Sequence, residues 1–390
     1  MKDCPICQKK ASYSKLLYEK PVAGLIDTKS LKNKCISHTI QFCDSCSTLF
    51  YPRTKESFIE LDKLYKYHPP TPRETTFYNA YYKWFSSFTK SYHKSNDIKI
   101  CEIGSNDGKL FNYLRKDYPN STFIGIEPSE EMVKYGKKNV GDNGFWYSSY
   151  FDLELSSKIK NISGKLDVII ARHVFEHVPQ PKNFIEAIGD LLADEGIGII
   201  ESPSLELILK KNRYENISYQ HLHHISCSAF NDLLKTFNLN LIHHRYVETD
   251  GGSNIFVFTK KGSQRNFKFE NINQEKIVNF FEAEFQVKKE ICNEIFSSTN
   301  GKIYGYGAGA KGQHLIHMFE LGEKIYRVLD NTLNFNNCFI PSTNIKVIMP
   351  ESLELDGLRI MNLAPTHFEV IKEKCKKCHS FFDIINYSKV

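Results

Sequence analysis

The stretch CEIGSNDGKL at residues 101–110 constrains the fold of this chain more than any other part of the sequence. An apolar run over 98–103 leads into it, and its glycines separate that run from a helical pattern. Further apolar strands are predicted at 122–126, 166–171 and 196–201, with helical segments between them. Repeated β-α-β units of this length predict an α/β fold with a central doubly wound parallel sheet.

The turn after the first predicted strand reads Glu102-x-Gly104-x-Asn106-x-Gly108 and lacks the G-x-G-x-x-G spacing that brings a backbone close to a pyrophosphate. This spacing predicts a cofactor without a pyrophosphate. Glu127 ends the second predicted strand, where a carboxylate can accept hydrogen bonds from both hydroxyls of a ribose. An adenosyl group meets both requirements, and we expect these residues to bind it at the carboxyl ends of the strands.

Two further segments extend this pattern: GIEPS at residues 125–129 and DVIIARHVFEHV at residues 167–178. Together with the first turn they resemble the three-part signature of class I S-adenosylmethionine-dependent methyltransferases. The resemblance implies that S-adenosyl-L-methionine is the cofactor and that Arg172 and His173 border it. His177 lies where the loop after this strand should face a substrate.

Histidines are concentrated in the segment RYENISYQHLHHISCSAF at residues 213–230. Histidine is the side chain whose pKa lies nearest the working pH, so the segment predicts a site for proton transfer or substrate orientation. We assign His221 as the base and place Tyr219 and Gln220 in the same catalytic site. Metal binding is an alternative, but no carboxylate falls at helical spacing to complete such a site.

The first 46 residues contain two C-x-x-C pairs that can each present two thiolates from one tight turn. Four soft ligands complete a closed tetrahedron around zinc, so the pairs predict a structural Zn²⁺ site rather than a catalytic one. Cys35 and His38 lie nearby as possible replacements for one ligand, and two unrelated thiol pairs are the plainer alternative. The predicted ligands are Cys4, Cys7, Cys43 and Cys46.

Bulk properties narrow the class of protein. A chain of 390 residues with 41% apolar residues is long enough for two or three domains. The net charge of +6 is compatible with a phosphorylated small-molecule substrate. Without a long basic run, it does not indicate nucleic-acid binding. The chain opens without an apolar segment and has no run long enough for a membrane span. We therefore expect a soluble cytoplasmic protein, a monomer or weak homo-oligomer, without a nucleic-acid or membrane partner.

A second strand and glycine turn occur late in the chain, at residues 302–312 (KIYGYGAGAKG). The spacing Gly307-x-Gly309-x-x-Gly312 matches the dinucleotide fingerprint, and Asp330 follows on a predicted strand. Alone it would favour a nicotinamide enzyme. The competing interpretation is a second Rossmann-like lobe that binds the pyrophosphate of another nucleotide, with Lys311 neutralising its charge.

Two other segments supply candidate substrate contacts. An aromatic helix is predicted at residues 74–93, and Tyr78 on it could cover a bound cofactor or substrate. The corner DGGS precedes an alternating strand, and its Gly252 and Ser253 could bring backbone amides to a ligand. Turn geometry alone explains the same glycines equally well.

Four motifs now stand in one order: the paired C-x-x-C, EIGSNDGKL, the histidine segment with Gly-Gly-Ser beyond it, and YGYGAGAKG at residues 304–312. Together they resemble the nucleotide-sugar C-methyltransferases, a three-domain family that methylates keto-deoxysugars. The resemblance covers nearly the whole chain. It implies a zinc-binding domain over 1–72, an S-adenosylmethionine-binding domain over 73–265 and a C-terminal Rossmann-like domain over 266–390, with a nucleotide sugar between the last two.

The resemblance carries over to individual residues with three departures. Gly307 and Lys311 match the family's glycine-alanine-lysine turn, and His221 matches its histidine. Ser218 stands where the family has a tyrosine and Gln220 where it has a glutamate. His224, which we place beside the substrate, replaces a residue that is usually aromatic.

These departures leave the acceptor atom open. Methylation of carbon beside a ketone requires removal of a weakly acidic proton, whereas an oxygen or nitrogen acceptor needs only a base and alignment. An O- or N-methyltransferase acting on a related sugar or surface-glycan precursor is therefore the alternative. A nicotinamide-dependent oxidoreductase, an RNA methyltransferase and an inactive scaffold are further alternatives.

Overall fold

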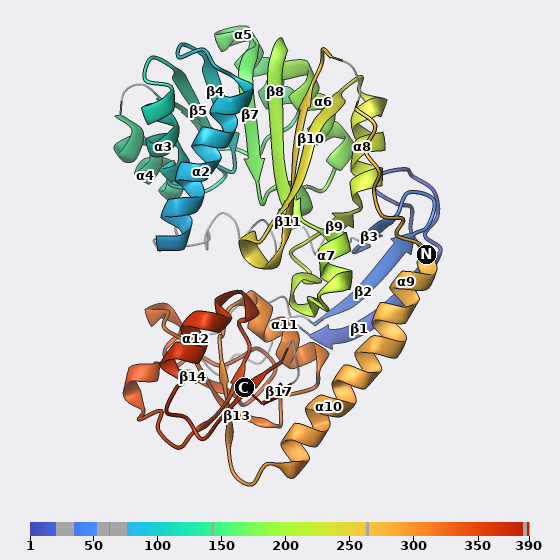
Figure 1. The fold of residues 1–390 in the computed structure, drawn as a ribbon, viewed down its shortest axis with the longest axis vertical. Helices are drawn as coiled ribbons and strands as arrows, with labels where there is room; N and C mark the ends of the chain where they lie inside the picture. The colour runs from blue at the N-terminus through green and yellow to red at the C-terminus, as the bar shows by residue number, and fades with distance from the viewer. Residues whose placement is uncertain are drawn as a thin grey trace.

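The computed structural model describes residues 1–20, 35–52, 62, 76–141, 144–262, 265–384 and 388–389. The chain forms three β-sheets, and a long helical segment connects the central sheet to the C-terminal sheet (Figure 1). The predicted Pro-Pro-Thr-Pro linker and the boundary at 72 lie outside the described residues.

The central sheet has seven strands in the order β10-β11-β8-β7-β4-β5-β6. Strands β4 to β8 of this sheet are parallel, and β11 is antiparallel to both of its neighbours. The doubly wound sheet predicted from the sequence is confirmed. Its strands are β4 (Lys99–Ile103), β5 (Thr122–Ile126), β6 (Gly144–Tyr147), β7 (Leu166–Arg172), β8 (Leu192–Pro203), β10 (Asn240–Val247) and β11 (Ser253–Thr259).

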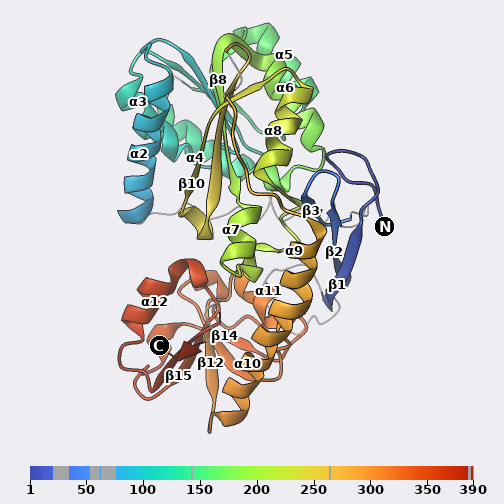
Figure 2. The ribbon, with the colours of Figure 1, turned by 45° about the vertical axis from the view of Figure 1, so that its right-hand side comes forward.

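Helices cover both faces of this sheet, as Figure 2 shows from a second direction. One core contains Phe85 and Phe111, and the other contains Ile159, Phe184 and Phe230. Both faces are apolar because the parallel strands are buried on each side. The first face is covered by α2 (Thr76–Tyr92), α3 (Lys109–Asp117) and α4 (Glu130–Val140), and the second by α5 (Leu153–Ser163), α6 (Pro181–Leu191) and α8 (Cys227–Thr236).

The N-terminal sheet has four strands in the order β1-β2-β3-β9. Its first three strands are β1 (Tyr13–Lys20), β2 (Ile36–Cys43) and β3 (Thr48–Phe50). Strand β9 (His223–Ile225) comes from the histidine-rich segment and pairs antiparallel with β3. The N-terminal lobe is therefore completed by residues that follow the central α/β units in sequence.

The C-terminal sheet has the order β14-β13-β12-β15-β16-β17, with β17 alone antiparallel among its described pairs. The predicted helix over 274–297 is present as α9 (Gln274–Asn279), a π turn (Phe280–Glu284) and α10 (Phe285–Ser298). The remaining elements are β12 (Ile303–Tyr306), α11 (Ala310–Met318), β13 (Ile325–Leu329), β14 (Lys346–Ile348), β15 (Arg359–Asn362), α12 (Phe368–Lys374), β16 (Ser380–Asp383) and β17 (Ser388–Lys389).

Short helical elements complete the loops: α7 (Leu205–Lys210) and the 3₁₀ turns Phe175–His177, Tyr214–Asn216, Thr249–Gly251, Leu333–Phe335, Pro350–Ser352 and Pro365–His367.

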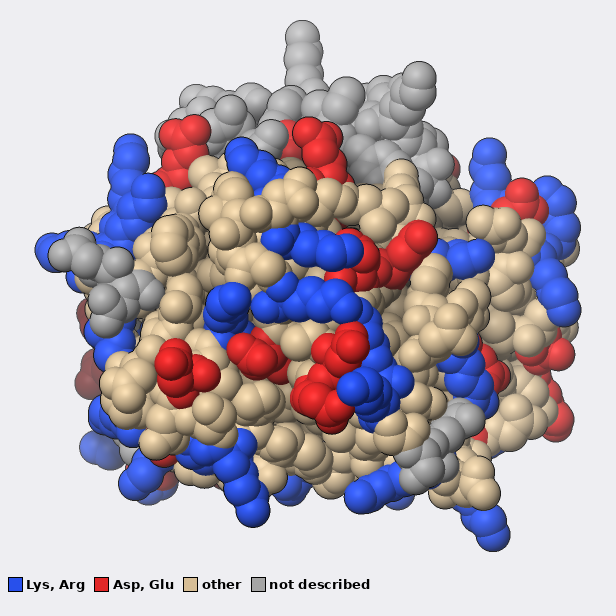
Figure 3. All heavy atoms as spheres, turned by 90° about the horizontal axis from the view of Figure 1, so that it is seen from above, with Lys and Arg blue, Asp and Glu red and all other residues tan. Residues whose placement is uncertain are grey.

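No helix in the described part of the chain combines the length and the apolar character needed to cross a membrane. On the face drawn in Figure 3, Lys and Arg are interspersed with Asp and Glu.

Candidate active site

A large cavity of about 2830 Å³ lies between the central and C-terminal sheets. Its wall includes residues directly after β4, β5 and β7 of the central sheet and residues after β12, β13 and β15 of the C-terminal sheet. Parallel α/β sheets bind ligands at the carboxyl ends of their strands. Both sheets therefore present their ligand-binding edge to one shared space.

The first glycine turn forms one end of this cavity. Gly104 has a φ of 71°, and a Cβ on it would lie 2.4 Å from Cγ2 of Val174. Glu127 Oε2 accepts a hydrogen bond from the backbone N–H of Asn106 at 3.1 Å, and Oε1 accepts one from the N–H of Ser129 at 3.0 Å. Burial raises the pKa of Glu127. The carboxylate predicted to bind a ribose thus lines the cavity and also fixes the turn.

Two predicted cofactor residues lie behind this wall. Gly108 has a φ of 72°, and a Cβ on it would lie 2.8 Å from Trp146. Glu102 is 1% exposed, and its Oε1 accepts from Nη2 of Arg172 at 2.6 Å and from Nε at 3.1 Å. Burial raises the pKa of Glu102, and the arginine opposes that effect. Of this pair only Arg172 lines the cavity, so Glu102 acts by holding the guanidinium.

His173 is surrounded by three carboxylates. Its Nε2 lies 3.4 Å from Oε1 of Glu201 and 3.4 Å from Oδ2 of Asp250, and its Nδ1 lies 3.4 Å from Oε1 of Glu176. Burial lowers the pKa of His173, but the carboxylates outweigh burial and raise this pKa to about 10. The backbone of His173 has a φ of 52°, so the residue is held in a left-handed conformation beside the cofactor end of the cavity.

Asp250 connects three parts of the cavity wall. Its Oδ1 accepts from the hydroxyl of Tyr78 at 3.1 Å, and its carbonyl oxygen accepts from Nζ of Lys311 at 3.0 Å. Tyr78 and Lys311, two of the predicted substrate contacts, both line the cavity. The bond to Lys311 joins the central segment to the start of α11 in the C-terminal lobe.

His177 and His221 lie together on the cavity wall, with ring centroids 5.1 Å apart. Nδ1 of His177 lies 2.8 Å from the carbonyl oxygen of Gln220, and Nδ1 of His221 lies 2.9 Å from that of Asn216. A nitrogen bonded to a carbonyl oxygen carries a proton, which leaves Nε2 as the reactive nitrogen of a neutral ring. Burial, with His177, His224 and Lys311 adding to it, lowers the pKa of His221 well below its usual value.

Other predicted site residues lie outside the cavity wall. The ring of Tyr219 packs against His38 and Tyr51 of the N-terminal lobe. His224 is buried behind His221, at 5.5 Å between ring centroids, and burial lowers the pKa of His224 to about 3. Gly252 lies between the 3₁₀ turn and β11, and Ser253 is the first residue of β11, where its hydroxyl donates to the carbonyl oxygen of Thr249. They shape the loop that presents Asp250.

The second glycine turn has the geometry of its fingerprint. Gly307 has a φ of 110°, and a Cβ on Gly312 would lie 2.2 Å from the carbonyl oxygen of Gly307. Asp330 Oδ2 accepts from the N–H of Ala308 at 2.7 Å, much as Glu127 accepts from the first turn. A Cβ on Gly309 would meet nothing within 4 Å, so the backbone there is open to a ligand in the cavity.

Three carboxylates of the site were not singled out from the sequence: Glu176, Glu201 and Asp250. Glu176 and Asp250 lie in the motifs HVFEHV and TDGGS, and Glu201 falls within a predicted strand. Their common signal is a position at or just beyond the carboxyl end of a strand. Glu176 also supplies the carboxylate that the metal alternative lacked, since one ligand atom each of Glu176, His177 and His221 lie within 4.8 Å of one another.

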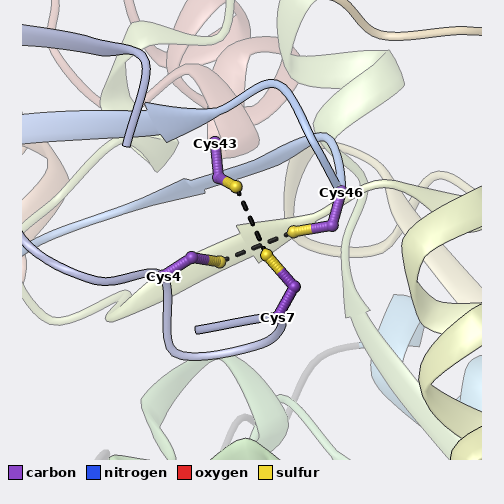
Figure 4. A group of neighbouring side chains, drawn as sticks. All are labelled: Cys4, Cys7, Cys43 and Cys46. Atoms are coloured by element: carbon purple, nitrogen blue, oxygen red, sulfur yellow. Dashed lines mark hydrogen bonds between the residues drawn. The ribbon is translucent and has the colours of Figure 1, made fainter. Parts of the chain in front are cut away.

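The four predicted zinc ligands converge in the N-terminal lobe (Figure 4). Sγ of Cys4 lies 3.5 Å from Sγ of Cys46, and Sγ of Cys7 lies 3.4 Å from Sγ of Cys43. Four sulfurs bound to one tetrahedral zinc are separated by about 3.8 Å, so the group fits the ion closely. The hydrogen bond with Cys46 lowers the pKa of Cys4 to about 6, toward the thiolate that zinc requires.

Comparisons with known proteins agree with this geometry. A family described as a methyltransferase domain matches residues 78–244, which contain the first turn and most of the central sheet. Over these residues the chain is similar to the class I S-adenosylmethionine-dependent methyltransferases. A second family, described as a C-methyltransferase C-terminal domain, matches residues 251–380.

Individual relatives are more distant. The chain is 24% identical over 269 residues to the C-methyltransferase NovU of Streptomyces niveus, covering 65% of this chain and 62% of that protein. It is 30% identical over 146 residues to a tRNA (guanine-N(7)-)-methyltransferase of Mesomycoplasma hyopneumoniae, covering 32% of this chain and 69% of that protein. A solved structure of magnesium protoporphyrin IX methyltransferase from Synechocystis matches 54% of this chain and 100% of that chain, with 13% identity and a TM-score of 0.39.

Proposed function

We propose that this protein transfers a methyl group from S-adenosylmethionine to carbon of a nucleotide-activated keto-deoxysugar. The observation that carries the proposal is the shared cavity, in which a methyl-donor turn and a dinucleotide-type turn face each other. The match of the second half of the chain to a C-methyltransferase C-terminal domain supports carbon as the acceptor. The substrate class follows the sequence resemblance.

The donor end of the cavity fits an adenosyl group. Bound S-adenosylmethionine supplies an electrophilic methyl group on a sulfonium. Glu127 is placed to accept from the ribose hydroxyls, and the open turn around Gly104 and Asn106 lets the backbone approach the ligand. Arg172, held by Glu102, offers a fixed cation for the carboxylate of the methionine moiety.

The opposite end fits a nucleoside diphosphate. The N-terminus of α11 and the open backbone at Gly309 favour a pyrophosphate, and Lys311 adds a positive charge. This arrangement orients the sugar toward the centre of the cavity, where His177 and His221 lie. We assign His221 as the base because its Nδ1 is hydrogen-bonded to the carbonyl oxygen of Asn216, which leaves Nε2 of the neutral ring to accept a proton.

The N-terminal lobe has a structural role in this proposal. A zinc ion held by the four cysteines would fix the lobe, whose β3 pairs with β9 directly after His221 and Leu222. The domains at 1–72, 73–265 and 266–390 remain our proposed division of the chain. The lobe would therefore help to position the base without entering the chemistry.

Mass spectrometry on a panel of nucleoside diphosphate sugars, with and without a keto group, tests this function. We expect a mass gain of one methyl group only with keto sugars and only with S-adenosylmethionine. Methylation of sugars that have no ketone would favour an oxygen or nitrogen acceptor. A rise in melting temperature with NADH but not with S-adenosylmethionine would favour the oxidoreductase alternative.

A further inference from the structure

The loop at residues 217–222 contributes four residues to the cavity wall, namely Ser218, Gln220, His221 and Leu222. Ile217 and Tyr219 lie instead in a buried apolar core, together with residues of β2 and β3. The loop therefore has one side in the proposed active site and its other side against the N-terminal lobe.

Tyr51 forms hydrogen bonds at both ends of this loop. It follows β3 directly and is 3% exposed. Its hydroxyl donates to the carbonyl oxygen of Ile217 at 2.7 Å, and its backbone N–H donates to the carbonyl oxygen of Leu222 at 3.0 Å. One residue of the N-terminal lobe thus holds the first and the last residue of the loop that carries the proposed base.

Two further contacts hold the loop from the central sheet. The N–H of Leu222 donates to the carbonyl oxygen of Glu176 at 2.6 Å, and the carbonyl oxygen of Gln220 lies 2.8 Å from Nδ1 of His177. Both contacts act on the second half of the loop, whereas the Tyr51 hydroxyl acts on its first residue. The position of the first half is therefore sensitive to Tyr51.

The first half of the loop also orients the ring of His221. The carbonyl oxygen of Asn216 lies 2.9 Å from Nδ1 of His221, and the carbonyl that Tyr51 binds belongs to the next residue, Ile217. A displacement of Ile217 shifts the Asn216 carbonyl with it. Such a shift changes the direction in which Nε2 of His221 points, and proton transfer depends strongly on that direction.

We infer that Tyr51 is a positioning residue of the reaction, which holds loop 217–222 so that His221 keeps its place and orientation on the cavity wall. Tyr51 does not itself line the cavity, so it acts through the loop and not on the substrate. The inference rests on the proposed function in giving His221 the role of base. The contacts between Tyr51 and the loop do not depend on that role.

Hydrogen exchange of the full chain, followed by mass spectrometry, tests the inference without a substrate. Tyr51→Phe keeps the ring and the backbone bond to Leu222 and removes the hydroxyl bond to Ile217. The amides of His221 and Leu222 donate to carbonyl oxygens in the folded chain. They should exchange about fivefold to tenfold faster in Tyr51→Phe, as the loss of one neutral hydrogen bond implies.

Tyr118→Phe is the matched control. Tyr118 is fully buried in the core beneath α2 and α3, and its hydroxyl donates to the carbonyl oxygen of His93 at 2.9 Å. This variant loses the same kind of bond and should leave the exchange of loop 217–222 unchanged. Unchanged exchange of the loop in Tyr51→Phe, or equally faster exchange in both variants, would overturn the inference whatever the substrate is.

Kinetics with the keto sugar found in the panel give the second readout. Tyr51→Phe should lower kcat about tenfold because the base is misplaced, while KM for the sugar and for the donor stays within about twofold. Tyr118→Phe should change neither constant. A raised KM with an unchanged kcat would contradict the inference. If no sugar of the panel is methylated, the proposed function fails and the exchange experiment alone decides the role of Tyr51.

A double variant shows whether Tyr51 acts through His221. In the His221→Ala background, Tyr51→Phe should change the residual turnover by less than about twofold, because the position of the loop no longer matters once the base is absent. An equal loss of turnover in both backgrounds would mean that Tyr51 acts on another part of the site, and the inference would be wrong.

Discussion

Nζ of Lys311 donates to the carbonyl oxygen of Asp250 across the cavity, at 3.0 Å. Lys311 belongs to the first turn of α11 in the C-terminal lobe, whereas Asp250 lies in the 3₁₀ turn before β11 of the central sheet. Asp250 in turn contacts His173 at the donor end. The proposed nucleotide end and the proposed donor end are therefore joined through one residue.

Replacing Lys311 with alanine should weaken the binding of the nucleotide sugar and leave the binding of the methyl donor unchanged. Loss of one charge beside a pyrophosphate should raise KM for the sugar about tenfold, while calorimetry shows unchanged affinity for S-adenosylmethionine. Lys311→Arg should keep most of the affinity, and Lys372→Ala, on the exposed side of α12, is the matched control. An unchanged KM in Lys311→Ala would remove the lysine from nucleotide binding.

Glu127→Ala should weaken the binding of the methyl donor rather than that of the nucleotide sugar. The carboxylate is placed to accept hydrogen bonds from the ribose hydroxyls, and it fixes the backbone of Asn106 and Ser129. Its loss should therefore lower the affinity for S-adenosylmethionine about 100-fold, as measured by calorimetry. Glu131→Ala, at the start of α4 in the same wall, should bind the donor normally. Equal affinities of wild type and Glu127→Ala would count against the ribose assignment.

The sequence predicted those parts of the site that depend on local chain geometry. Gly104, Asn106 and Glu127 follow strands, and strand ends in a parallel sheet meet at one edge, so their proximity could be inferred. Long-range packing decided the rest. Tyr219 turns toward the N-terminal lobe because the next residues form β9 on β3, a pairing between positions about 175 residues apart that no local pattern indicates.

Glu102 shows a second limit of the sequence. Its place in the turn motif suggested contact with the cofactor, yet residues alternate sides along a strand and Glu102 is buried under Arg172. The same limit hid Glu176, whose significance depends on the fold bringing it beside His177 and His221. Sequence patterns predicted which segments meet, and the packing determined which side chains face the cavity.

Loss of the cysteine cluster should destabilise the N-terminal lobe. Chelation or Cys43→Ser should lower the first unfolding transition by more than about 5 °C, because a closed zinc site contributes directly to folding. Metal analysis should find one zinc per chain in the wild type and none in the variant. Cys35→Ser, at an exposed thiol of the same lobe, should keep both zinc and stability, and loss of zinc in that variant would revise the ligand set.

His173 should make stability fall at alkaline pH. Its folded pKa of about 10 lies above the ordinary value of 6.5, so the folded state binds the extra proton in this range. The stabilisation is complete below pH 6.5 and is lost as the pH rises toward 10. Denaturant titrations at intervals over this range should show a decline that is flattened in His173→Gln and retained in His243→Gln; a parallel decline in both variants would assign it to other groups.

His221→Ala should separate binding from chemistry. Removal of a general base lowers turnover about 100-fold to 10,000-fold, whereas the ring lies against His177 and the Asn216 carbonyl oxygen, so calorimetric affinity for S-adenosylmethionine should be unchanged. His379→Gln, outside the cavity, controls for the loss of a histidine elsewhere in the chain. Because the Asn216 carbonyl holds the Nδ1 proton, His221→Asn should also fail to support turnover even if it folds normally. Unchanged turnover in His221→Ala would remove His221 from the mechanism, and the base would then have to come from another group on the cavity wall.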